Sequence, residues 1–306
     1  MTLISNSTSA FYDRSLIGLT DLRAQAEALQ ANLSSGNKLS VASDDPVAAA
    51  RLRQLSRSDT LSTIDTANAQ RATSDLQLTD GALSSFADYV TRAKELATQA
   101  ATGTLTDGQR QSIGAEISAI RQNVLGLANS RDSNGHALFG GETAGAAYTL
   151  DAAGNAVYSG TASAGQLPLG DGQVVSRGIT GPEFLNFTVG GNPNDLLATL
   201  KTLGDALQTG GAAAQTAAHD ALDPLNAAVD TLTTAQTVVG SRMAWIDLTT
   251  TRRTDMGEMR ASEEADVGGT DIAATVAHLQ QTMTVLEASQ SSFAKLAQLS
   301  LFDVLH

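Results

Sequence analysis

Adjacent carboxylates are the first residues in this sequence that could do chemistry. Asp44 and Asp45 could act as an acid and base pair or hold a metal ion. Both stand directly before Pro46, and this order is typical of a helix start, where carboxylates cap backbone N–H groups and interact favourably with the helix dipole. We therefore predict that Asp44, Asp45 and Pro46 form a helix cap without a catalytic role.

The other candidates for chemistry lack the companion residues that their reactions require. Ser35 and Lys38 have the spacing of a serine acyltransferase motif but not its partner motifs, and the glycines around Asp171 do not form a nucleotide-binding loop. The sequence has no cysteine, and its histidines do not show metal-ligand spacing. These histidines are His136, His219, His278 and His306. We predict no metal, no cofactor and no enzymatic activity.

Charge and hydropathy exclude further classes of function. The 306 residues carry a formal net charge of -13, which disfavours binding to nucleic acid or to anionic lipid. No apolar run is long enough for a conventional membrane span, and the first residues do not resemble a cleavable signal peptide. If the protein leaves the cell, we expect another export route to carry it.

Elements that could position functional residues are mostly helices. One segment starts at Ser43 to Pro46 and stops near Gly103, and the next opens with a capping box at Thr106 and runs to Asn134-Gly135. From Leu222 to Ile246, apolar residues alternate three and four apart, the spacing of a coiled-coil seam. We interpret these inner stripes as the core of one helical bundle.

The two chain ends carry another pair of apolar stripes. One helix ends at Ser34 to Asn37, and the other runs from about 270 to 300. Glycines at Gly36 and Gly268-Gly269 separate both from the bundle, as in arms that become ordered on assembly. The predicted assembly interface consists of Leu16, Leu19, Leu22, Leu29, Leu33, Ile272, Val276, Leu279, Met283, Leu286 and Phe293.

The middle of the chain has a different composition. Between Gly140 and Pro193 lie 12 of the 27 glycines and three of the five prolines, and short apolar runs there indicate strands. These runs are 148–150, 157–158, 174–175 and 187–189. The predicted fold is mainly α, a long antiparallel helical bundle from both ends with a small β-rich insert. The predicted domains are 1–40 with 270–306 for assembly, 41–139 with 192–269 for the bundle, and 140–191 for the insert.

Several motifs together resemble bacterial flagellins and their relatives. The segments 34–40 and 43–50 resemble the N-terminal signature of this family, and 134–141, with Phe139, Gly140 and Gly141, resembles the exit into its variable domain. The returning segment 240–243 and the terminal segment 270–305 are also similar. The resemblance covers both arms in the family's order, and it implies an axial protein whose terminal helices form the inner tube.

Within the family, Pro46, the exit at Phe139 to Gly141 and the ending Leu299 to Phe302 are most similar to subunits that join hook and filament. The resemblance implies type III export with an export chaperone, a location at the hook–filament junction, and assembly into a ring. It also implies contacts with flagellin and with the neighbouring hook-associated protein. A filament flagellin is the alternative. An enzyme in the insert is disfavoured, because the insert has about 50 residues and no histidine.

Overall fold

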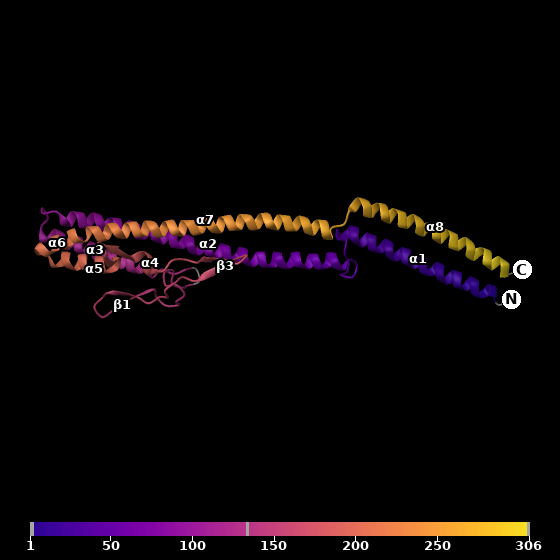
Figure 1. The fold of residues 1–306 in the computed structure, drawn as a ribbon, viewed down its shortest axis with the longest axis horizontal. Helices are drawn as coiled ribbons and strands as arrows, with labels where there is room; N and C mark the ends of the chain where they lie inside the picture. Colours follow the sequence, from indigo (N-terminus) through magenta and orange to yellow (C-terminus); the bar gives the residue numbers. More distant parts are fainter. Residues whose placement is uncertain (1–2, 133–134, 305–306) are drawn as a thin grey trace. The chain divides into compact units, whose positions relative to one another are not determined.

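A computed structural model describes the backbone of residues 3–132 and 135–304 and the side chains of residues 10–132 and 135–295. The fold is mainly helical, as predicted, with short antiparallel strands in the middle of the chain (Figure 1). The helices are α1 (Leu3–Ser35), α2 (Pro46–Ala101), α3 (Asp107–Ala128), α4 (Gly181–Leu185), α5 (Leu196–Thr209), α6 (Gly211–Asp220), α7 (Leu222–Gly268) and α8 (Ile272–Val304). The strands are β1 (Tyr148–Leu150), β2 (Ala156–Tyr158), β3 (Gln166–Gly170), β4 (Gln173–Ser176), β5 (Asn186–Val189) and β6 (Asn192–Asp195).

The chain divides into two compact units. The first, here called the terminal unit, combines the segment up to Thr60 with the segment from Met256 onward. The second, the central unit, runs from Leu61 to Asp255 and contains all of the strands. Long helices continue from one unit into the other, because α2 and α7 each cross the boundary. The three-domain division stays a prediction.

Most of the buried apolar side chains lie in the central unit. The stripe expected from Leu222 to Ile246 lies on α7, where four of its members are buried in one core with α2 and α3. The largest buried side chains of this core include Leu76, Leu83, Phe86, Ile117, Phe139 and Phe184.

No described helix combines the length and the apolar character needed to cross a membrane.

The start of α3 follows the sequence prediction, but its end does not. Thr106 forms the predicted capping box, in which its hydroxyl accepts from Gln109 N–H and the Gln109 side chain accepts from Thr106 N–H. The helix was expected to run to Asn134-Gly135 but ends at Ala128. Asn129 explains the early end, because its side chain accepts from Tyr148 N–H and donates to the Tyr148 carbonyl, which ties the chain to β1.

The strands form three separate antiparallel hairpins: β1 with β2, β3 with β4, and β5 with β6. Four of the six strands, β1, β2, β4 and β5, contain the short apolar runs predicted from sequence. The strands β3 and β6 and the helices α4, α5 and α6 were not among the predicted elements. A bulge between Pro168 and Gly170 shifts the register of the second hairpin. Pro193 in β6 cannot donate to a ladder, which is compatible with an edge position.

Three phenylalanines join the insert to the helices. Phe86 on α2, Phe139 after α3 and Phe184 on α4 are each fully buried. Their ring centroids lie 4.9 to 5.7 Å apart in tilted or edge-on arrangements. Arg177, which follows β4, also pairs with Asp75 of α2 at 2.9 Å. These contacts make the insert part of the core of the central unit.

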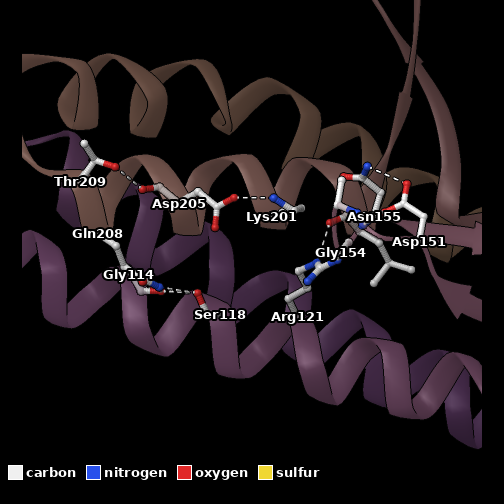
Figure 2. Close-up of polar contacts among 12 residues, drawn as sticks. Gly114, Ser118, Arg121, Asp151, Gly154, Asn155, Lys201, Asp205, Gln208 and Thr209 are labelled. Carbon is white, nitrogen blue, oxygen red and sulfur yellow. Dashed lines mark hydrogen bonds and ion pairs between the residues drawn. The ribbon is translucent and has the colours of Figure 1, made fainter.

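The α3–α5 contact requires two glycines. A Cβ atom at Gly114 would lie 2.9 Å from Leu207 Cβ, and one at Gly204 would lie 2.8 Å from Ser118 Oγ. The close approach lets Gln208 donate to Ser118 Oγ at 2.8 Å and to the Gly114 carbonyl at 3.4 Å (Figure 2). Near the other end of the contact, Arg121 donates to the carbonyl of Gly154 in the β1–β2 turn (Figure 2).

Removal of one aromatic ring tests the phenylalanine cluster. We expect Phe184→Ala to lower the free energy of unfolding by about 3–5 kcal/mol, because it opens a cavity in a fully buried site. Urea unfolding of the isolated protein measures the change. Leu150→Ala is the control, since Leu150 is exposed in the same insert. Equal losses for the two variants would contradict the assigned role of the cluster.

The α3–α5 contact can be tested with a pair of glycine substitutions on one helix. Gly114→Ala should destabilise the protein by about 1–3 kcal/mol, because the added methyl overlaps Leu207 and the backbone of Gln208. Gly126→Ala meets no atom within 4 Å and should stabilise by up to about 1 kcal/mol through helix propensity. Thermal unfolding of both variants measures the difference, and a stabilising Gly114→Ala would contradict the close contact.

Candidate assembly site

The helices from the two chain ends lie side by side in the terminal unit. They run antiparallel, so the described starts and ends of the chain meet (Figure 1). Seven of the predicted interface residues are half-buried along this pair. Tyr12, which the prediction omitted, stacks edge-on against Phe293 with ring centroids 5.5 Å apart. The seven residues are Leu19, Leu22, Leu29, Leu33, Leu279, Leu286 and Phe293.

The other four predicted interface residues remain exposed in the single chain. Leu16 is 51% exposed on α1. On α8, Ile272 is 65%, Val276 37% and Met283 46% exposed, and we call these three residues the α8 ridge. The structure therefore divides the predicted interface into a half-buried part that joins α1 to α8 and a part that stays largely exposed to solvent.

Helix geometry explains the exposure of Val276 and Met283. Leu279, Leu286 and Phe293 recur every seven residues and face α1. Each residue turns a helix by about 100°, so Val276 and Met283 lie about 40–60° to one side of Leu279. Two helices in contact bury one narrow face each, and an apolar stripe wider than that face leaves its flank uncovered.

A groove opens on the opposite flank of the same helix pair. It has a volume of about 440 Å³ and lies between residues 11–22 of α1 and residues 289–293 of α8. We call it the α1–α8 groove. Gly18 and the serines at 289 and 292 leave it open, and Phe11 and Phe293 contribute aromatic walls. Among its residues Phe11 is 48% exposed, so this apolar surface is also incompletely covered.

Both terminal helices meet the rest of their unit at a single joint. Lys38 N–H donates to the Gly268 carbonyl at 2.7 Å, and Thr270 N–H donates to the Gly36 carbonyl at 2.9 Å. Gly36 has a φ of 72°, which favours glycine and ends α1. Because the two breaks in the helices bond to each other, the start of α8 is fixed beside the end of α1.

The paired aspartates have different roles in the structure. Asp45 caps α2, since its Oδ1 accepts from Ala48 N–H at 3.0 Å, and Pro46 is the first helical residue. Asp44 instead accepts from the N–H groups of Ser40 and Val41, both at 2.9 Å, and closes the preceding turn. The expectation that both carboxylates cap the helix is therefore corrected for Asp44.

Ion pairs join α2 to α7 beyond the joint. Arg51 binds Glu263 through one edge of its guanidinium, with Nε donating to Oε1 and Nη2 donating to Oε2 at 2.7 Å, and Arg260 Nε donates to Asp59 Oδ1 at 2.7 Å. The hydrogen bond from Arg51 lowers the pKa of Glu263. Because both partners are exposed to solvent, we expect the pair to set register more than stability.

The remaining predicted motif residues lie in the central unit. Phe139 is in the aromatic cluster, and the Gly140 carbonyl accepts from Thr161 N–H at 3.1 Å. Gly141 has a φ of 69°, and a Cβ there would overlap Thr161 Oγ1, so glycine is required. These residues shape the entry to the insert. No group of three metal-ligating side chains occurs within the described ranges.

Comparison with known proteins agrees with this arrangement. Residues 5–144 match the family model of the bacterial flagellin N-terminal helical region. Flagellar hook-associated protein 3 of Escherichia coli is 25% identical over 97% of this chain and 98% of its own length. The flagellar filament 31.3 kDa core protein of Treponema maltophilum is 31% identical, but over only 46% of this chain and 49% of its own length.

Solved structures share the fold. FlgL from Xanthomonas campestris superposes with a TM-score of 0.61 at 17% identity, over 69% of this chain and 99% of that chain. Flagellar hook-associated protein 3 from Legionella pneumophila superposes with a TM-score of 0.64 at 15% identity, over 70% of this chain and 98% of that chain. The chain is therefore similar to bacterial flagellins in its N-terminal helical region, and its similarity to flagellar hook-associated protein 3 extends over almost its whole length.

Proposed function

We propose that this protein is a structural subunit of the bacterial flagellum that joins hook to filament and assembles through its α1–α8 pair. One observation carries the assembly role: the terminal unit is incompletely buried. Among the described residues of that unit, the buried apolar side chains are Ala26, Ala49 and Leu55. Neighbouring copies that covered the exposed apolar surface would supply about 25 cal/mol for each Å² removed from water.

The junction role is favoured over the filament role by the extent of similarity. The match to flagellar hook-associated protein 3 includes the insert, whereas the match to the Treponema filament protein covers less than half of the chain. A junction subunit contacts its own copies, flagellin on one side and a hook-associated protein on the other. We further propose that the subunit is exported by the flagellar type III apparatus with a chaperone, and that its role is structural and not catalytic.

Labelling of a single introduced thiol locates the protein. The sequence has no cysteine, and Ser159 is exposed in the segment that connects β2 to β3. Ser159→Cys therefore gives one reactive site. We expect a thiol dye applied to intact cells of the native host to label one spot at the base of each filament. Label along the whole filament would instead identify a flagellin, and no surface label would exclude the flagellar location. The unsubstituted protein is the control.

A charge on the α8 ridge tests the assembly role. Met283→Asp should leave the isolated chain folded, because Met283 is exposed, but should abolish incorporation by placing a charge in the contact between copies. Circular dichroism measures folding, and the protein content of isolated flagella measures incorporation. Ala277→Asp is the control, because Ala277 is exposed on the face of α8 away from α1. Normal incorporation of Met283→Asp would contradict the role of the ridge.

A further inference from the structure

The α1–α8 groove has the chemistry of a site for an apolar side chain. Aromatic and leucine side chains form its walls, and Gly18 and two serines of α8 leave its volume of about 440 Å³ open. No charged side chain lines the groove among the described residues. Ser15, also in the lining, already donates its hydroxyl to the Phe11 carbonyl at 2.9 Å. An apolar occupant would therefore leave this hydroxyl satisfied.

The α8 ridge has the complementary surface. Its three side chains are apolar and exposed, and Met283 is unbranched, so it can adapt to an irregular cavity. Val276 and Met283 of the ridge lie about 40–60° to one side of the line that faces α1, whereas Ser292 of the groove lies about 100° to the other side of Phe293. Ridge and groove are thus on opposite flanks of one helix pair.

We propose that the α8 ridge of one copy, with Met283, occupies the α1–α8 groove of the next copy. The inference rests on the proposed self-assembly and names the contact that performs it. A contact between two different surfaces repeats from copy to copy and generates a ring or a helical array, whereas a self-complementary contact stops at a dimer. An uncharged contact also suits copies of a chain with a net charge of -13, because it adds no repulsion at the interface.

Disulfide trapping tests the proposal in assembled flagella. Two single-cysteine forms, Met283→Cys and Ser292→Cys, are produced together in the native host with tags of different size, and isolated flagella are oxidised. We expect a disulfide-linked dimer that contains one copy of each form. A mixture of Ala277→Cys and Ser292→Cys is the matched control, and we expect it to give no such dimer, because Ala277 faces away from both surfaces.

The outcomes separate this inference from the proposed function. Equal trapping in the test and control mixtures, or dimers of Met283→Cys with itself, would overturn the ridge-in-groove contact while leaving self-assembly intact. Dimers of Ser292→Cys with a flagellar protein of another kind would assign the groove to that partner and also overturn it. If the unsubstituted protein is missing from isolated flagella, the proposed function itself fails.

Filling the groove gives an independent measurement. Gly18 lines the groove, and a Cβ atom there meets no atom within 4 Å, so Gly18→Leu adds apolar atoms to the groove without a clash at Cβ. We expect the isolated variant to keep its helix content and to lose incorporation into flagella. Gly81→Leu is the control, because it makes the same change at an equally open site of α2 in the central unit. Normal incorporation of Gly18→Leu would contradict the proposal.

Discussion

A pair of helices can bury only one face of each helix, and this constraint governs the terminal unit. In α1 and α8, the face that recurs every seven residues is used for their mutual contact. The apolar stripe on α8 is wider than that face, so its flank remains in water as the α8 ridge. A surface of this kind has a free-energy cost in the isolated chain, and coverage by neighbouring copies removes that cost.

The central unit avoids the same cost by adding layers. There α2 and α7 contribute to one core with α3, α5 and the insert, and apolar stripes of the long helices are buried in it. The cluster of Phe86, Phe139 and Phe184 makes the insert a part of this core. One pair of long helices thus continues from a unit with a large core into a unit in which Ala26, Ala49 and Leu55 are the buried apolar side chains among the described residues.

The joint between the helices holds α1 and α8 together at one end. Backbone hydrogen bonds from Lys38 to Gly268 and from Thr270 to Gly36 join two segments that are far apart in sequence. Two independent flexible linkers would let α1 and α8 move separately, and the α1–α8 groove would then lack a fixed shape. Because the breaks bond to each other, the start of α8 is held beside the end of α1.

Local patterns determined much of this protein. Periodicity predicted the long helices, the capping box at Thr106 predicted the start of α3, and glycine and proline clusters predicted four strands, because these signals depend on near neighbours. Tertiary contacts decided the rest: Asn129 ends α3 early through Tyr148, and Asp44 and Asp45 divide their roles. The split between packed Leu286 and exposed Met283 also required the structure, because spacing places both on one stripe and only the position of α1 selects which is covered.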